Sequence, residues 1–218
     1  AALYGSAAAN GAILITTKKG KEGKMNIQLS SNTEFGNPFV LPEFQNTYGS
    51  DGKVTSWGAK LPDDAKRYDV KDFFRTATTL TNSVALSGGT EKNQTYFSAA
   101  STNAEGLVPN NQYNRYNFTV RNTTHLLNDR LRIDASASYI LQNHLNMINQ
   151  GEYMNPLVSA YLMPRGYGLQ RARQFERYNP TTHIYEQVWG DFTAGPDGTF
   201  NGSFAGDYSL QNPYWVAY

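Results

Sequence analysis

Residues 130–142 read RLRIDASASYILQ, and apolar and polar side chains alternate along most of this stretch. Successive side chains of a β-strand point to opposite faces, so a period of two separates the two sets. The apolar set is Leu131, Ile133, Ala135, Ala137, Tyr139 and Leu141, and the polar set is Arg130, Arg132, Asp134, Ser136 and Ser138. The stretch therefore predicts a strand with one apolar and one polar face.

The same alternation predicts four more strands, at residues 25–36, 80–87, 94–103 and 114–124. In the last of these, the two faces are Tyr116, Phe118 and Val120 against Arg115, Asn117, Thr119 and Arg121. Turns rich in glycine, asparagine and aspartate at residues 88–93 and 127–129 join neighbouring strands. The chain is therefore predicted to be all-β, with antiparallel strands in meander order.

Strand length separates the two main classes of all-β protein. Alternation alone favours an antiparallel β-sandwich, because soluble β-proteins are the commoner class. The predicted strands reach about 9–12 residues, however, which matches a tilted membrane-crossing strand. Short turns also alternate with long loops, such as residues 37–79, which contain a short helical candidate at residues 69–74. Together with polar faces that contain arginine and asparagine, these features favour part of a large transmembrane β-barrel.

Composition excludes several other classes of protein. The chain has 218 residues, no cysteine and a net charge of +1, so we expect no disulfide scaffold, no thiolate metal site and no nucleic-acid partner. Aromatic residues make up 13%, which is not the profile of a disordered chain. No apolar run approaches the ~18 residues of a membrane-spanning helix. The first residue is not Met, and we expect the natural start of the protein to lie upstream.

Residues 1–21 read AALYGSAAANGAILITTKKGK. Within them, residues 12–17 form a β-branched run that predicts a buried strand. Residues 18–24 are rich in lysine and glycine, which indicates a solvated linker, with contact to anionic lipid headgroups or phosphate as the alternative.

The whole N-terminal string resembles the end of the plug domain in SusC/RagA-type TonB-dependent outer-membrane transporters. The signature residues in this chain are Tyr4, Gly5, Ser6, Asn10 and Gly11. Ala7 stands where the family pattern usually has arginine, so this chain lacks that positive charge. Further elements similar to the family lie at residues 82–90, 96–98, 105–110, 113–117 and 212–215.

The resemblance implies a 22-stranded β-barrel that is occluded by an N-terminal plug. Residues 1–20 would be the C-terminal end of the plug domain, and residues 21–218 the first strands and extracellular loops of an incomplete barrel. It also implies nutrient import across the bacterial outer membrane with energy passed through TonB, which would bind a segment upstream of this chain. A SusD-like surface lipoprotein would be the partner, glycans or oligopeptides would be the substrates, and no cofactor is implied.

Substrate capture is expected in the outward-facing loops, which the topology places at residues 37–79, at residues 104–113 and after residue 143. Seven loop aromatics are the candidate substrate-binding residues: Trp57, Tyr153, Tyr161, Tyr167, Tyr185, Trp189 and Tyr214. The alternative is that these rings pack the loops on themselves or form interfacial girdles. On the inward polar face, Arg115, Arg121, Arg132 and Asp134 are expected to hydrogen-bond the plug or the barrel wall, or else to line the substrate path.

No catalytic constellation stands out, so we expect no enzymatic activity. His125, His144 and His183 are far apart in sequence and have no carboxylate at ligand spacing, so no metal site is predicted. Two other classes stay open, a soluble carbohydrate-binding β-sandwich and a β-rich glycoside hydrolase. A hydrolase needs two carboxylates about 5–10 Å apart. The available carboxylates are Glu152, Glu176, Glu186 and Asp191, and their spacing selects no pair.

Overall fold

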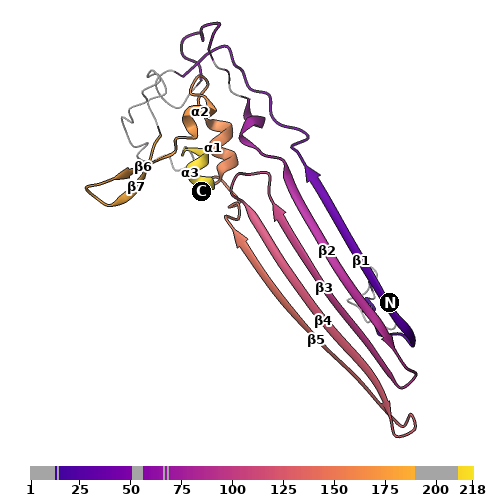
Figure 1. The fold of residues 1–218 in the computed structure, drawn as a ribbon. Coiled ribbons are helices and arrows are strands. Elements are labelled where there is room, and N and C mark those ends of the chain that lie inside the picture. Colours follow the sequence, from indigo (N-terminus) through magenta and orange to yellow (C-terminus); the bar gives the residue numbers. More distant parts are fainter. Residues whose placement is uncertain (1–12, 14, 51–55, 66, 68, 190–210) are drawn as a thin grey trace, which may run out of the picture. The chain divides into compact units, whose positions relative to one another are not determined.

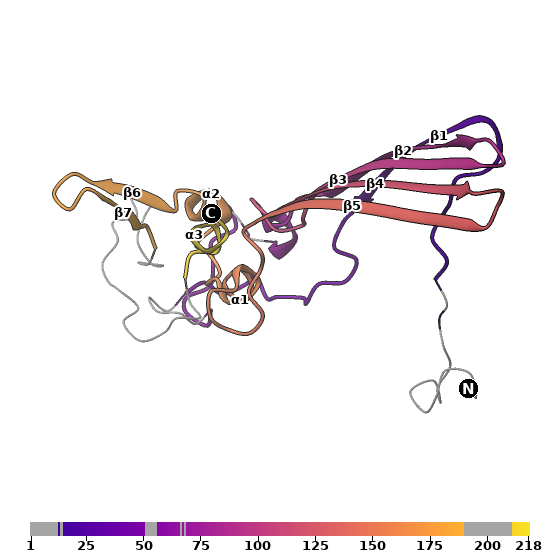
Figure 2. The same ribbon diagram turned by 90° about the horizontal axis from the view of Figure 1, so that it is seen from below.

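The structure is a computed structural model, and it describes residues 13, 15–50, 56–65, 67, 69–189 and 211–218. Five strands form one sheet: β1 (Gly23–Gly36), β2 (Ala77–Gly89), β3 (Asn93–Glu105), β4 (Gln112–Leu126) and β5 (Leu131–Leu145). They are paired in sequence order, as an antiparallel meander (Figure 1). Viewed from below, the strands form a single layer (Figure 2). All five predicted strands are confirmed. Within the described residues the sheet is open, since β1 and β5 each pair on one side only.

The chain divides into two compact units. The first comprises residues 1–31, 82–101 and 116–141, and the second comprises residues 32–81, 102–115 and 142–218. The first unit therefore contains the segment before β1 and the turn-side parts of the strands. The second contains the long loops and the remaining parts of the strands.

The tight turns of the first unit contain residues that suit their backbone conformations. Leu127, Asn128 and Asp129 join β4 to β5 with positive φ angles of 54°, 54° and 66°. Asparagine and aspartate tolerate this left-handed region, whereas leucine adopts it rarely. Gly89, the last residue of β2, has a φ of 150°, and a Cβ there would lie 2.1 Å from the carbonyl oxygen of Asn93. Only glycine fits this position.

Contacts between β4 and β5 confirm the two predicted faces. Arg121 bonds Asp134, and the hydroxyl oxygens of Thr119 and Ser138 lie 3.0 Å apart. The polar sets of the two strands therefore share one face, and the alternation of side chains places the apolar sets together on the other. On this apolar face, Ile133 is 46% exposed in the described structure.

One prediction for the first unit is wrong. Residues 15–17 are not in a strand, and the side chains of Ile13 and Ile15 are 93% and 82% exposed, where a buried strand was expected. A short apolar run forms a strand only when a neighbouring strand supplies hydrogen bonds. Among the described residues, no strand pairs with this run.

The second unit folds around short elements: η2 (Val70–Phe73), α1 (Pro156–Leu162), α2 (Leu169–Ala172), β6 (Glu176–Asn179), β7 (Ile184–Gln187) and α3 (Pro213–Ala217). The helical candidate at residues 69–74 is confirmed as one 3₁₀ turn, capped by the carboxylate of Asp69. The β6–β7 hairpin was not predicted, because four-residue strands show too little alternation. No helix that the structure describes has the length and apolar composition to cross a membrane.

Two of these helices begin with the dipeptide Asn-Pro. The side chain of Asn155 accepts a hydrogen bond from the backbone nitrogen of Leu157, and the side chain of Asn212 accepts one from that of Tyr214. Proline follows each asparagine at the first helical position, where its missing N–H costs nothing. The core of the unit comprises Val70, Phe73, Val108, Ala160, Met163, Tyr167, Ala172, Trp189, Tyr214 and Ala217.

Candidate functional site

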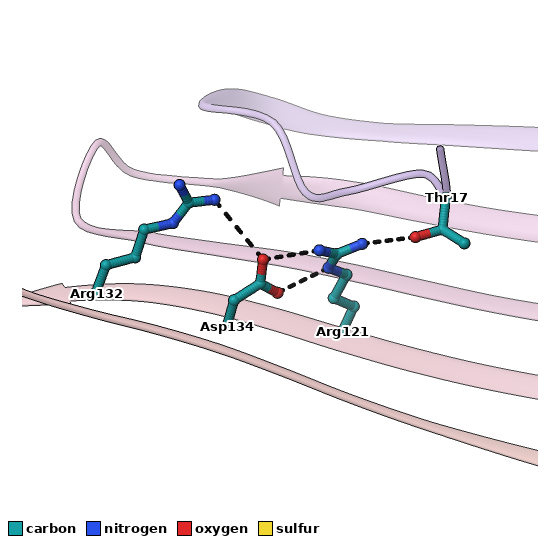
Figure 3. A network of polar contacts seen from close by, with 4 residues as sticks. All are labelled: Thr17, Arg121, Arg132 and Asp134. Atoms are coloured by element: carbon teal, nitrogen blue, oxygen red, sulfur yellow. Dashed lines mark hydrogen bonds and ion pairs between the residues drawn. The ribbon is translucent and has the colours of Figure 1, made fainter. Parts of the chain in front are cut away.

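A polar network joins the N-terminal segment to the polar face of the sheet (Figure 3). Arg121 on β4 binds Asp134 on β5 through two parallel hydrogen bonds, from Nε at 2.8 Å and from Nη2 at 2.7 Å. Its third nitrogen, Nη1, donates to the hydroxyl oxygen of Thr17 at 2.7 Å. Arg132 approaches the same carboxylate at 3.7 Å. One guanidinium therefore holds both a neighbouring strand and the segment that precedes β1.

The geometry of Arg121 explains why it can serve two partners. A guanidinium is a planar fork, and a carboxylate that occupies Nε and Nη2 fixes the direction of Nη1. The side chains of Arg121 and Asp134 are 17% and 26% exposed, so water only partly competes with these bonds. Asp134 thus orients the nitrogen that binds Thr17.

Gly20 makes the second contact between this segment and the sheet. A Cβ at this position would lie 2.6 Å from the backbone nitrogen of Thr95 and 2.7 Å from the carbonyl carbon of Gln94. Both atoms belong to the backbone of β3, which cannot move aside as a flexible side chain would. The backbone of Gly20 therefore lies directly against the start of β3, and only glycine permits this approach.

The lysine-rich residues also lie on the polar face of the sheet. Lys18, Lys19, Lys21 and Lys24 line a cavity of about 390 Å³ together with Asn26, Gln28, Ser87 and Tyr96. Asn26 and Gln28 belong to the polar set of β1, opposite Met25 and Ile27. The four lysines therefore line a cavity whose other residues are mostly polar and include the acidic Glu22.

The seven loop aromatics fall into two groups. Tyr167, Trp189 and Tyr214 are buried in the core of the second unit, where Trp189 is 2% exposed. The rings of Tyr167 and Trp189 meet edge to face at 5.1 Å, and those of Phe73 and Tyr214 do so at 5.2 Å. Tyr161 packs against the edge of this core. In the described structure, these four rings hold the loops together.

The other three aromatics are exposed. Trp57 is 73% exposed, with Tyr48 at 6.2 Å between ring centres. Tyr185 lies on the β6–β7 hairpin beside Tyr178, at 5.3 Å, and Tyr153 is also exposed. The structure therefore does not bring the seven candidates into one site. The signature residues Tyr4, Gly5, Ser6, Asn10 and Gly11 lie outside the described residues.

Local polar contacts involve His125, His183 and Glu186. His183 meets the hydroxyl of Tyr178 at 3.0 Å, and Nδ1 of His125 lies 3.3 Å from Asp129. Hydrogen bonds from Asn179 and Arg177 lower the pKa of Glu186. No group of three metal-ligating side chains occurs in the part of the chain that the structure describes, and Asp191 lies outside it.

Two buried polar residues of the loops were missed by the sequence analysis. Arg165 is almost fully buried, and its guanidinium lies 4.3 Å above the ring of Phe44. Asn212 is completely buried, and its side-chain nitrogen donates to the carbonyl oxygens of Ala172 and Val188. The Asn-Pro dipeptide could have identified Asn212 as a helix cap, but no sequence signal marks Arg165.

Part of the sequence is similar to two TonB-dependent receptors. It is 29% identical over 146 residues to the TonB-dependent receptor SusC of Bacteroides thetaiotaomicron. The aligned region covers 64% of this chain and 14% of that receptor. The chain is similar to part of a TonB-dependent receptor. It is also 33% identical over 135 residues to the TonB-dependent receptor P39 of Formosa agariphila, covering 53% of this chain and 12% of that receptor. No protein-family model matches the sequence.

Both similarities agree with the strand meander and with its two faces. TonB-dependent receptors are outer-membrane transporters rather than enzymes, and their barrels are built from antiparallel strands. The chain covers less than one sixth of the length of either relative. The five antiparallel strands are consistent with a portion of such a barrel.

Proposed function

We propose that this chain supplies the end of the plug and the first five barrel strands of a TonB-dependent receptor that imports nutrient oligomers across the bacterial outer membrane. Residues 1–20 belong to the plug, and residues 21–218 belong to the barrel and its extracellular loops. The observation that carries the proposal is the bond from Arg121 to Thr17. It attaches the N-terminal segment to the polar face of a membrane-length sheet, where a plug would contact the barrel wall.

The dimensions of the apolar face support the membrane assignment. From Leu131 to Leu141 the chain advances ten residues, or about 33 Å along the strand at about 3.3 Å per residue. At a tilt of about 40°, this corresponds to about 25 Å along the membrane normal, which is the height of the apolar band on outer-membrane barrels.

The same proposal includes a substrate and two protein partners. Glycans are the favoured cargo and oligopeptides the alternative, with a SusD-like surface lipoprotein covering the extracellular loops. The name of the relative SusC supports this pairing. TonB would act through a plug segment upstream of residue 1. Of the loop aromatics, Trp57, Tyr153 and Tyr185 are placed to meet a ligand, because their rings are exposed.

Fractionation of cells that express the full-length protein tests the proposal. The polypeptide that contains this sequence should be several times longer than 218 residues, lie in the outer membrane and co-purify with a surface lipoprotein after detergent extraction. Deletion of its gene, or of TonB, should abolish growth on at least one polymeric nutrient. A short polypeptide in the aqueous fraction would instead support the soluble sandwich.

A further inference from the structure

The lysine-lined cavity of the first unit carries an excess of positive charge. Four lysines and one acidic residue, Glu22, line it, which leaves a formal charge of +3. All of the lining residues belong to the first unit. The volume of about 390 Å³ falls within the range of small-ligand pockets, about 300–1,000 Å³. Neither the charge nor the space is used by the contacts described above.

The lysines come from two parts of the chain that are attached to the sheet. Lys18 and Lys19 lie between two contacts, the bond from the hydroxyl of Thr17 to β4 and the close approach of Gly20 to the backbone of β3. Lys24 belongs to β1, which pairs with β2. The backbone on both sides of the cavity is therefore held in place before any ligand arrives, which lowers the entropic cost of binding.

The chain does not neutralise these lysines. None of the four forms a salt bridge in the part of the chain that the structure describes. The carboxylate of Asp134, in the network that includes Thr17, already accepts two hydrogen bonds from Arg121 (Figure 3). Like charges that line one cavity repel each other, and a bound anion would relieve this repulsion.

The neutral polar lining and the type of cation favour phosphate oxygens. The amides of Asn26 and Gln28 and the hydroxyls of Ser87 and Tyr96 can all donate hydrogen bonds. Every cationic residue among the described lining residues is a lysine. Lysine is a common phosphate binder that acts as a point charge, whereas the planar fork of arginine matches a carboxylate. The lining therefore suits a phosphate group better than a carboxylate.

The position of the cavity on the sheet favours a soluble ligand over a lipid. Asn26 and Gln28 belong to the polar set of β1, and Met25, Ile27 and Leu29 point to the opposite face. Under the proposed function, that opposite face meets the lipid chains. A lipid headgroup would have to reach across the sheet to enter the cavity, whereas a soluble anion can approach it from the polar side.

We propose that this cavity binds a soluble anion that carries at least two phosphate groups, held between the segment before β1 and β1 itself. One phosphate group has a charge of about −1.5 to −2 at pH 7, so two such groups match the formal charge of +3. The bound anion would link Lys18, Lys19 and Lys21 to Lys24 and so fasten the segment to the sheet. The site goes beyond the import proposal, and only its location inside a barrel rests on that function.

The test uses the full-length protein, purified in detergent and in phosphate-free buffer. Sodium triphosphate is titrated by calorimetry at low salt, and saturable binding is expected. Lys21→Gln and Lys24→Gln should each weaken it about two- to fivefold, because each removes one exposed ion pair. Lys92→Gln is the matched control, since Lys92 is an exposed lysine of the same unit that does not line the cavity, and it should bind as the wild type does.

Hydrogen exchange at residues 15–21 supplies a second readout. Triphosphate should slow this exchange about threefold or more in the wild type and leave it unchanged in the double variant Lys21→Gln/Lys24→Gln. These lysines are exposed, so both substitutions should leave assembly of the protein intact. Absence of saturable binding would overturn the site, and so would an equal loss of affinity in Lys92→Gln.

A third measurement separates the two sources of phosphate. The protein is placed in nanodiscs with and without phosphatidylglycerol, and triphosphate is omitted. The anionic lipid should leave exchange at residues 15–21 unchanged. Protection by the lipid alone, with no further slowing on addition of triphosphate, would assign the cavity to a lipid headgroup and overturn the soluble ligand. None of these results alters the outer-membrane location or the TonB-dependent growth, so they are distinguishable from failure of the import proposal.

Discussion

The two faces of β5 predict opposite responses to a buried charge. The apolar set runs from Leu131 to Leu141, so its centre lies near residue 136, where Ala135 points to the apolar face and Ser136 to the polar one. Each residue advances about 2.5 Å along the membrane normal at a tilt of about 40°. Ala135 is thus about 2.5 Å from the midplane, and Leu131 about 12 Å.

The cost of arginine on the lipid face depends on this depth. It amounts to about 2–4 kcal/mol at the midplane and about 0–1 kcal/mol near the interfaces. Ala135→Arg should therefore destabilise the barrel by about 2–4 kcal/mol, and Leu131→Arg by about 1 kcal/mol or less. Ser136→Arg, on the polar face, should be far milder than Ala135→Arg although the two positions are adjacent.

Two quantities are measured for the full-length protein in outer membranes. The first is the fraction that stays folded in detergent at room temperature, and the second is the urea concentration at which half of the protein is unfolded. Both values should fall for Ala135→Arg and stay near the wild type for the other two variants. An equal loss for Ser136→Arg and Ala135→Arg would refute the assignment of the two faces. An equal loss for Leu131→Arg and Ala135→Arg would refute the placement of the midplane.

Three further predictions concern the N-terminal segment and the loops. Thr17→Val removes the acceptor of Arg121, so hydrogen exchange at residues 15–21 of the full-length protein should become about three- to tenfold faster, while Thr16→Val, the neighbouring control, should leave it unchanged. Gly20→Ala places a Cβ against the backbone of β3, so limited proteolysis of this segment should become faster, and an unchanged rate would contradict the close approach. The hydrogen bond from the backbone nitrogen of Lys71 lowers the pKa of Asp69 below its ordinary value of 3.8. The ionised Asp69 carboxylate should therefore stabilise η2 above pH 3.8, and this stabilisation should be lost as the pH falls through the lowered pKa. Exchange protection at residues 70–74 should follow this course, whereas Asp69→Asn should keep the cap and lose the pH dependence.

The sheet could be predicted because its information is local. In β5, apolar and polar residues alternate from Leu131 to Tyr139, so the residue type alone predicts the face on which each side chain lies. The turn residues Asn128 and Asp129 indicate where the strand begins. No contact between distant residues is needed to recognise such a pattern. The N-terminal run was mispredicted, because the β-branched residues Ile13 and Ile15 favour a strand but have no strand beside them in the described structure.

The loops could not be predicted because their structure depends on distant contacts. Trp57 and Trp189 both lie in long polar segments, yet one is exposed and the other buried. The difference comes from Tyr167 and from the other core residues around Trp189, which no local pattern connects to it. Arg165 is a further example, since only the ring of Phe44, more than a hundred residues earlier, explains a buried guanidinium there.

For Arg121, too, the sequence predicts the local position but not the distant partner. Its position on the polar face follows from alternation, but its partner Thr17 is 104 residues away. The guanidinium of Arg121 binds Asp134 through two nitrogens and Thr17 through one. The attachment of the N-terminal segment is therefore the weaker of the two interactions. A force on that segment would break the bond to Thr17 first and leave the ion pair between β4 and β5 in place. Under the proposed function, the end of the plug could therefore detach without exposing an unpaired charge on the barrel wall, and Arg121 would remain oriented to bind Thr17 again.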